Sequence, residues 1–267
     1  MSTKIGFIGT GVMGGALARA VSKTEKDIML SNVPESTAKA LASEIGGKVG
    51  TNLQVAENCE YIVLAVKPQV IFSVIAEIAP VLKTRNDNFV LITIAAGVSI
   101  ASIKQAIGID LPIIRLMPNT PVSVGKGVIL SAFSGVSETQ KAEFFSLFSA
   151  AGFCDEIAES KIDAAGALTG CGPAFAYIAM QSLADGAVAC GIDRQTATKY
   201  AEMTVLGAAR LAVESGEHLE KLKDAVCSPA GSTIEGVNVL ENRSVRAAFA
   251  EAVKASYKRS LELGKGK

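Results

Sequence analysis

The chain has few of the residues and motifs that enzymes commonly use for acid–base or metal chemistry. Its 267 residues include a single histidine, His218, in the polar stretch Glu214–His218, where an exposed loop position is the simplest interpretation. No HExxH motif or carboxylate cluster is present, so the sequence predicts no metal site. Several usual catalytic devices are therefore absent.

An excess of either charge is also lacking. The chain has 26 basic and 26 acidic residues, and no stretch concentrates lysine or arginine. Because phosphate contacts require a basic face, nucleic acid is not an expected partner. The five cysteines are an odd number without CxxC spacing, which favours free thiols in a reducing cytosol over disulfides or a zinc site. No signal peptide is recognisable, so we expect a cytoplasmic protein.

One uncharged stretch, residues 164–184, has about the length of a membrane-spanning helix. Gly166, Gly170, Gly172 and Pro173 interrupt it in the middle. A glycine-rich turn that leads into a helix buried on nearly all sides is the better interpretation. Such a helix lies in a large core or in a subunit interface, so we expect no membrane association.

The most informative feature that is present stands at the start of the chain. Gly9-x-Gly11-x-x-Gly14 directly follows the apolar run Lys4–Ile8 and directly precedes a helical pattern. In this context Gly9 allows a tight turn, Gly11 lets the backbone approach a pyrophosphate, and Gly14 lets the helix pack against the strand. The helix N-terminus adds free N–H groups and a partial positive charge. The pattern predicts dinucleotide binding.

Up to about residue 155, short β-branched runs alternate with helical patterns, which predicts a parallel sheet with right-handed crossovers. Ser99 and Ser137 are suitable N-caps, and Gln140 completes a capping box with Ser137. The predicted strands are Lys4–Ile8, Asp27–Ser31, Glu60–Val66, Phe89–Ala95, Pro112–Met117 and Gly127–Ala132. The predicted helices are Met13–Ser22, Glu35–Glu44, Pro68–Leu82, Ser99–Ala106 and Ser137–Ala151.

After about residue 158 the strand patterns stop, and helical spacing dominates. The fold class is therefore α/β followed by all-α, with a first domain over residues 1–158 and a second over residues 159–267. The helices predicted in the second domain are Ala174–Cys190, Arg194–Ser215, Gly231–Leu240 and Val245–Leu263.

The end of the second predicted strand bears on the choice of nucleotide. NAD-binding proteins of this architecture usually hold the ribose 2′-hydroxyl with an acid about 20 residues past the glycines. Here Ser31 and Asn32 occupy that place and Glu35 opens the next helix, so a 2′-phosphate is not repelled and NADP is favoured over NAD. Lys67, in Ala65–Pro68 after the next long strand, is placed to reach the nucleotide. Alternatively, these residues form a polar turn and a solvent-facing lysine.

A second glycine-containing loop, Ser228–Thr233, precedes a predicted helix. Its backbone N–H groups suit an anion, here a carboxylate, and Thr233 adds a hydroxyl that can donate and accept a hydrogen bond. The alternative is an ordinary helix start with Ser228 or Ser232 as the N-cap.

Six ordered motifs now identify a family. The chain resembles the pyrroline-5-carboxylate reductases over essentially its whole length. The motifs are the opening IGTGVMGGALA, the AVKP turn, ITIAAGVS, RLMPNTP, LTGCGPAFAY and the late SPAGSTIEG loop. The resemblance implies reduction of 1-pyrroline-5-carboxylate to L-proline, the last step of proline biosynthesis.

The resemblance also implies an N-terminal Rossmann domain, a C-terminal helical domain that interlocks with a second subunit, and a substrate site at the interface of a homodimer or higher homo-oligomer. NADPH would be preferred, with NAD possible. The implied cofactor contacts, together with the glycine motif, are Ile8, Gly9, Thr10, Gly11, Val12, Met13, Gly14, Ser31, Asn32, Asn52, Ala65, Val66, Lys67, Pro68, Ala95 and Ala96. The implied substrate contacts are Glu159, Ser228, Gly231, Ser232 and Thr233, with Thr233 beside the reacting nitrogen as the catalytic residue.

Two departures and two rival functions qualify this interpretation. Cys171 stands where the family commonly has Ser, and Ala230 where it commonly has Gly. A β-hydroxyacid dehydrogenase would place a lysine on the helix after a glycine turn, whereas the helix that begins near Pro173 has no lysine until Lys199. A non-catalytic NADP sensor would have no reason to keep the Ser228–Thr233 loop.

Overall fold

The computed structural model describes residues 3–264, and the chain divides into two compact units. The sheet unit contains the residues up to Cys171 together with the stretch from Ser256, and the helical unit is Gly172–Ala255. The domain boundary between residues 158 and 159 stays a prediction.

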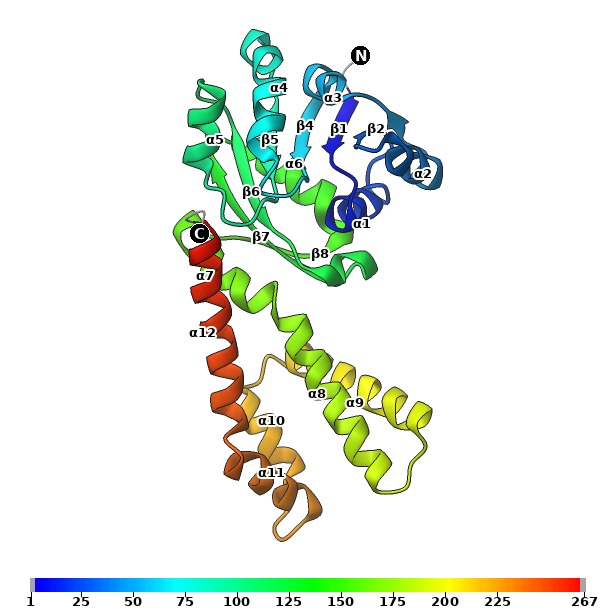
Figure 1. Ribbon diagram of the computed structural model, residues 1–267. Coiled ribbons are helices and arrows are strands. Elements are labelled where there is room, and N and C mark those ends of the chain that lie inside the picture. Colours follow the sequence, from blue (N-terminus) through cyan, green and yellow to red (C-terminus); the bar gives the residue numbers. More distant parts are fainter. Residues whose placement is uncertain (1–2, 265–267) are drawn as a thin grey trace. The chain divides into compact units, whose positions relative to one another are not determined.

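One mixed sheet forms the centre of the sheet unit (Figure 1). Within the described residues it has eight strands in the order β3-β2-β1-β4-β5-β6-β7-β8. The strands are β1 (Thr3–Ile8), β2 (Ile28–Ser31), β3 (Lys48–Val49), β4 (Cys59–Leu64), β5 (Val90–Thr93), β6 (Ile113–Met117), β7 (Gly127–Ser134) and β8 (Gly152–Glu156).

The expectation of a wholly parallel sheet is wrong at one pair. β6 and β7 run antiparallel, with Ile114 opposite Phe133, while the other strand pairs are parallel. The physical reason is the short connection between them, in which the 3₁₀ turn η1 (Thr120–Val124) reverses the chain instead of a crossover helix. The parallel-dominated Rossmann-type architecture is confirmed.

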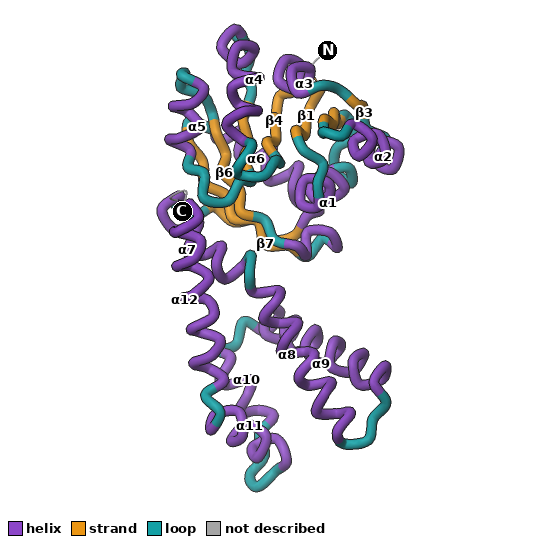
Figure 2. The backbone as a smooth tube through the Cα atoms, in the orientation of Figure 1, coloured by secondary structure: helices purple, strands orange, loops and turns teal. Residues whose placement is uncertain are grey.

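Helices cover both faces of the sheet (Figure 2). Ser99 and Ser137 cap two of them as predicted, and the Ser137–Gln140 capping box is present. Two of the helices, α3 and α7, were not predicted. The helical segments are α1 (Val12–Val21), α2 (Glu35–Ile45), α3 (Asn52–Asn58), α4 (Ile71–Thr84), α5 (Ile100–Ile107), α6 (Glu138–Phe148), the 3₁₀ turn η2 (Ser149–Ala151) and α7 (Glu159–Thr169).

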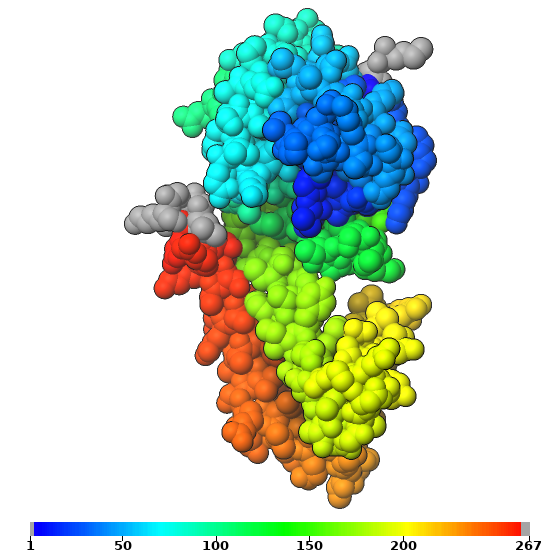
Figure 3. Space-filling view, turned by 45° about the vertical axis from the view of Figure 1, so that its right-hand side comes forward, coloured from blue at the N-terminus to red at the C-terminus, as the bar shows by residue number. Residues whose placement is uncertain are grey.

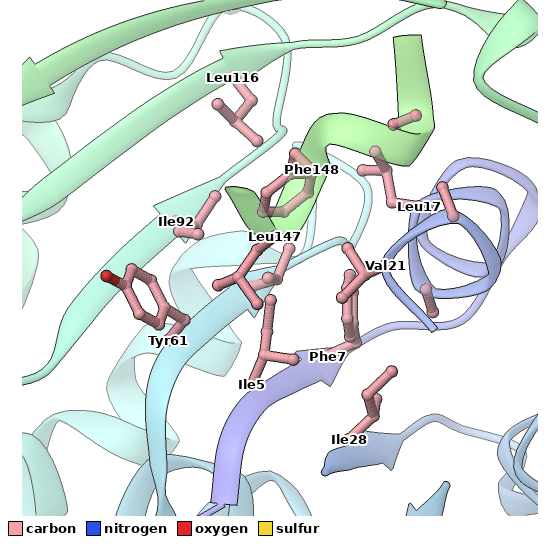
Figure 4. Close-up of a cluster of buried hydrophobic side chains, with 14 of the residues drawn as sticks. Ile5, Phe7, Leu17, Val21, Ile28, Tyr61, Ile92, Leu116, Leu147 and Phe148 are labelled. Atoms are coloured by element: carbon pink, nitrogen blue, oxygen red, sulfur yellow. The ribbon is translucent and has the colours of Figure 1, made fainter. Parts of the chain in front are cut away.

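The core of the sheet unit has two layers because the central strands are apolar on both faces. On β1, Phe7 packs into one layer with Leu17 of α1 and Phe148 of α6 (Figure 4). The neighbouring Ile8 packs into the other layer, with α3, α4 and α5. This double burial holds the strands rigidly, and it fixes the loops at their carboxyl ends.

The helical unit has a much smaller core. Its buried cluster consists of Ala184, Ala197 and Ala201, where α8 packs on α9. Among the described residues, no helix is long and apolar enough to cross a membrane. The helices are α8 (Gly172–Ala189), α9 (Arg194–Ser215), α10 (Leu219–Val226), α11 (Ser232–Asn242) and the first part of α12 (Val245–Gly264).

Many large apolar side chains of the helical unit are exposed. This unit is the yellow-green to orange part of the space-filling view (Figure 3). Part of this surface forms a groove of about 600 Å³ between α8 and the α11–α12 region, which includes Ile178, Leu183, Leu240 and Phe249. A single chain leaves this apolar surface uncovered.

Candidate active site

The strand order places one candidate site at the carboxyl ends of β1 and β4. The chain moves outward from β1 to β2 and β3, and then crosses back to β4 on the other side of β1. In open α/β sheets, ligands bind at such a reversal of strand order. Backbone hydrogen bonds from Gly9 N to Ser31 O (2.8 Å) and from Ala65 N to Ile8 O (2.8 Å) tie the loops of this edge together.

The turn after β1 matches the geometry that its glycines predicted. Gly9 has φ +100°, and a Cβ there would lie 2.6 Å from the carbonyl oxygen of Ala65. A Cβ at Gly14 would overlap the carbonyl oxygen of Gly9, because α1 crosses β1 closely. A Cβ at Gly11 would meet nothing within 4 Å. The loop therefore packs tightly against its neighbours at Gly9 and Gly14, and it has free space beside Gly11.

The N-terminus of α1 has unused donors at this open side. Gly11 is the N-cap and provides no side-chain hydrogen bond, so the first N–H groups of the helix have no intrahelical partner. Thr10 Oγ1 is buried without a hydrogen-bond partner in the described structure, while Thr10 N donates to Asn32 Oδ1 (2.8 Å). Free N–H groups, an orphaned hydroxyl and space above Gly11 fit the pyrophosphate of a dinucleotide.

At the end of β2, the chain has Ser31 and Asn32 in place of an acidic residue, so neither position repels a 2′-phosphate. Ser31 is buried, and its hydroxyl donates to Asn52 Oδ1 (2.7 Å) at the start of α3. Asn52 Nδ2 donates in turn to Glu77 Oε2 (2.8 Å) on α4. Asn32 Nδ2 donates to the carbonyl oxygen of Pro34 (3.0 Å). The structure thus brings Ser31, Asn32 and Asn52 together, and it adds Glu77, which the sequence did not indicate.

The remaining predicted cofactor residues follow β4 and β5 at the same edge. Lys67 and Ala96 are exposed, whereas Ala95 is buried. A hydrogen bond from Ile94 N to Leu64 O (3.2 Å) joins the ends of the two strands. Their positions agree with a dinucleotide lying along the carboxyl edge of the sheet, although their contacts with it stay a prediction.

Glu159, predicted near the substrate, begins α7 in the sheet unit. Its Oε1 accepts a hydrogen bond from Ile100 N (2.7 Å), at the N-terminus of α5, and lies 3.5 Å from Arg115 Nη1. Arg115 is only 4% exposed and also donates to Asp163 (2.5 Å). Arg115 is the one charged residue of the otherwise apolar strand β6, and this sequence feature could have indicated the buried ion cluster.

The predicted substrate loop lies in the helical unit and forms a tight turn. Gly231 N donates to Ser228 O (3.0 Å), and Ala230 has φ +58°, as residues at the third position of a type II turn do. A Cβ at Gly231 would overlap the Ser228 hydroxyl. Gly231 is the N-cap of α11, so the alternative with Ser228 or Ser232 as the N-cap is wrong. A glycine takes that position because no side chain fits inside the turn.

Beyond this turn, the N-terminus of α11 also has free donors. Its N-cap makes no side-chain hydrogen bond, so the N–H groups of Ser232 and Thr233 have no partner within the helix. Both residues are exposed. Two backbone donors, the positive end of an eleven-residue helix and the Thr233 hydroxyl can hold a carboxylate with a polar group beside it.

Strong acid–base groups are scarce in the described residues. His218 is exposed and lies in the loop before α10, as predicted; it is also the N-cap of that helix and accepts a hydrogen bond from Glu220 N. Burial raises the pKa of the Cys59 thiol to about 12 and that of Cys154 to about 11, so neither is a nucleophile at neutral pH. No group of three or more potential ligands among the described residues could hold a metal ion.

A separate hollow of about 620 Å³ lies at the opposite, amino-end edge of the sheet. Three of its lining residues are paired: Tyr61 donates to Glu143 (2.8 Å), and Lys4 bridges Glu143 and Glu60. Burial raises the pKa of the Tyr61 hydroxyl, and hydrogen bonds from Tyr61 and Lys4 lower the pKa of Glu143. None of the predicted site residues lines this hollow.

Two segments of the chain match known family models. Residues 159–263 match the family model described as pyrroline-5-carboxylate reductase dimerisation, and residues 4–97 match the model described as NADP oxidoreductase, coenzyme F420-dependent. The pyrroline-5-carboxylate reductase of Methanosarcina acetivorans is 39% identical over 98% of both chains.

Solved structures give the same result. The Coxiella burnetii pyrroline-5-carboxylate reductase superposes with a TM-score of 0.90 at 32% identity, over 98% of this chain and 99% of that one. The Plasmodium falciparum pyrroline carboxylate reductase, solved with NADP bound, has a TM-score of 0.85 at 31% identity over 98% of each chain. The chain therefore belongs to the pyrroline-5-carboxylate reductase family, oxidoreductases of the final step of proline biosynthesis.

Proposed function

We propose that this chain reduces 1-pyrroline-5-carboxylate to L-proline with NADPH as its preferred reductant. One observation carries the proposal beyond the family: the same chain holds two uncapped helix N-termini, each preceded by a tight glycine turn. The first, at Gly11, has room for a pyrophosphate. The second, at Gly231, offers free backbone donors to a carboxylate, which is the anionic group of the substrate.

In this mechanism, the protein binds and orients its two ligands. Backbone N–H groups of Ser232 and Thr233 hold the substrate carboxylate, and the Thr233 hydroxyl hydrogen-bonds the ring nitrogen, whose charge changes during reduction. Bound NADPH supplies the hydride that adds to the C=N carbon. A protonated imine is already a good hydride acceptor, which agrees with the scarcity of acid–base groups.

The NADPH preference is supported by the end of β2. Ser31 and Asn32 stand where an acid would select against a 2′-phosphate, and the exposed Lys67 is available at the same edge. Ser31→Asp should repel the phosphate and shift the ratio of kcat/KM toward NADH. An unchanged ratio in this variant would remove the support.

A homodimer formed through the helical unit completes the proposal. The apolar groove between α8 and the α11–α12 region supports it, since a lone chain exposes this surface. The unpaired cysteines support a reducing, cytoplasmic location. Light scattering at low micromolar concentration should find no folded monomer.

The function itself is tested by NADPH oxidation with pyrroline-5-carboxylate, against a panel of β-hydroxyacids with NADP. Turnover of the cyclic imine alone is expected. Turnover of a β-hydroxyacid would favour the dehydrogenase alternative, and binding of NADPH without turnover of any substrate would favour a sensor.

A further inference from the structure

Two hydrogen bonds link Ser31, Asn52 and Glu77 in series at the adenosine end of the proposed cofactor site. The direction in which each bond is donated is fixed. A carboxylate can only accept, so Glu77 requires Asn52 to turn its NH₂ group outward, toward α4. The amide oxygen of Asn52 then faces Ser31, and the Ser31 hydroxyl must donate its proton to that oxygen. Glu77 therefore determines, through one amide, where the Ser31 proton points.

This polarity matters at the position where the nucleotide ribose lies under the proposed function. A Ser31 hydroxyl whose proton is used offers a ligand only lone pairs. Lone pairs suit a ribose 2′-hydroxyl, which can donate, and they do not suit a 2′-phosphate, which at neutral pH mainly accepts. The Glu77 carboxylate also adds a negative charge two hydrogen bonds away from that position.

We propose that Glu77 is a specificity-determining residue that acts through Asn52 on Ser31 and limits the preference for NADPH over NADH. It touches neither ligand and is a positioning residue. The absence of an acid at the end of β2 admits the 2′-phosphate, and Glu77 keeps the unphosphorylated ribose competitive. This inference rests on the proposed cofactor site. Glu77 makes the chain less selective for NADPH over NADH than the residues at the end of β2 would make it on their own.

Substitutions at Glu77 can reverse the polarity. In Glu77→Gln, the side-chain amide can donate or accept, so Asn52 is free to turn and Ser31 regains a proton for the phosphate. In Glu77→Lys, the ammonium group can only donate, which holds the Asn52 oxygen outward and directs its NH₂ group at Ser31. The preference for a ligand with a 2′-phosphate should rise from the wild-type protein to Glu77→Gln and again to Glu77→Lys.

The test measures binding without turnover. Calorimetry gives the affinities of adenosine 2′,5′-bisphosphate and of 5′-AMP for the full-length protein and its variants. Glu77→Gln should raise the affinity ratio of the two probes about three- to tenfold, as expected for one gained hydrogen bond, and the NADPH:NADH ratio of kcat/KM should follow. Glu77→Lys should raise it further.

Two controls separate this effect from a general field. Glu57→Gln removes the same charge from an exposed position on α3, the helix that begins at Asn52, and should leave the ratio within about twofold. In an Asn52→Ala background, Glu77→Gln should also change the ratio less than about twofold, because the connecting amide is gone. An equal effect in that background, or no effect of Glu77→Gln alone, would overturn the inference.

The outcome also distinguishes this inference from the proposed function. A protein that binds both probes but does not reduce pyrroline-5-carboxylate would refute the proposed reaction while leaving the ratios measurable. An active enzyme with an unchanged ratio in Glu77→Gln would refute the role of Glu77 alone. If neither probe bound the wild-type protein, the inference would fail, because it requires the ribose at Ser31.

Discussion

The buried side chains of the sheet unit are large, whereas those of the helical unit are small. Phe7, Tyr61 and Phe148 are almost completely buried in the first unit, and the cluster in the second consists of alanines such as Ala184 and Ala197. Close helix packing through alanine buries little apolar area, and hydrophobic stabilisation scales with buried area. The sheet unit can therefore be stable as part of a single chain, while the helical unit depends on further contacts.

The difference extends to the two candidate binding loops. The turn after β1 is fixed from below by a closed core, because Gly9 lies against Ala65 and Gly14 against Gly9. The Ser228–Thr233 loop lies in a unit whose large side chains are largely exposed, including Leu183 and Leu240. Under the proposed function, cofactor affinity is thus a property of one chain, and the precision of the substrate site is a property of the assembly.

The largest expected effect is on assembly. Phe249→Glu places a carboxylate in the apolar groove, and a symmetric dimer would bury that charge twice, so the dissociation constant should rise at least about a thousandfold. Phe72→Glu on α4 is the matched control, since Phe72 is 46% exposed and Phe249 is 42% exposed. Sedimentation velocity should find monomers for Phe249→Glu alone. Dimers of that variant would refute the groove as an interface.

The next effect concerns the closed core. Phe7→Ala should lower the free energy of unfolding of the sheet unit by about 3–5 kcal/mol, because a fully buried ring leaves a cavity. The dimer dissociation constant should hardly change. Leu240→Ala, at a position in the groove that is 53% exposed, should instead raise the dimer dissociation constant and leave the stability of the sheet unit nearly unchanged. Denaturant titrations at several protein concentrations decide the matter, and a loss of assembly in Phe7→Ala would contradict the division between the units.

Thr233 tests the chemistry of the helical unit. Thr233→Ala should lower kcat/KM about 10²–10³-fold, or roughly 3–4 kcal/mol, because it removes a hydrogen bond that strengthens as charge leaves the ring nitrogen. Thr233→Ser keeps the hydroxyl and should retain most activity. If Thr233 only supports the start of α11, the Ala variant should lose about 1 kcal/mol of stability with intact turnover. Measuring kcat/KM and Tm for both variants separates the two roles.

The smallest effect is expected at Ala230. Its φ of +58° costs a non-glycine residue about 1–2 kcal/mol, which Ala230→Gly would remove. The added freedom of glycine in the unfolded chain costs about 0.5–1 kcal/mol, so the net gain in stability should be about 1 kcal/mol or less. Thermal unfolding measures it. A clear loss of stability in this variant would mean that Ala230 does not hold the left-handed conformation.

Local patterns in the sequence predicted β1, β2 and β4 to β7, most of the helices and the glycine turn, but they did not predict the short edge strands β3 and β8 or the helix α10. Ser99 and Ser137 cap helices as predicted because a capping residue acts within one helical turn. Helix α3 was missed although Thr51 and Gln54 form a capping box, since its seven residues are too few for a clear apolar period. The direction of β7 was missed because the short connection through η1, and not the strand itself, sets it.

Contacts between distant elements could not be predicted in the same way. Glu77 is an ordinary exposed glutamate in the sequence, and only the packing of α3 on α4 brings it to Asn52. Likewise, nothing near Glu159 in the sequence indicates that its carboxylate accepts a hydrogen bond from Ile100 N, at the start of α5, beside Arg115. Such interactions depend on tertiary geometry, which period and propensity do not contain.

The three glycines of the first motif carry different kinds of information. At Gly9 and Gly14 the backbone itself leaves no room for a side chain, so these two report how a strand and a helix fit together, whether or not any ligand is bound. Only Gly11 faces open space, and only its glycine needs a ligand to account for it. A descendant that lost its nucleotide would still have to keep the outer two. In relatives that no longer bind a nucleotide, we therefore expect Gly11 to be replaced while Gly9 and Gly14 are kept.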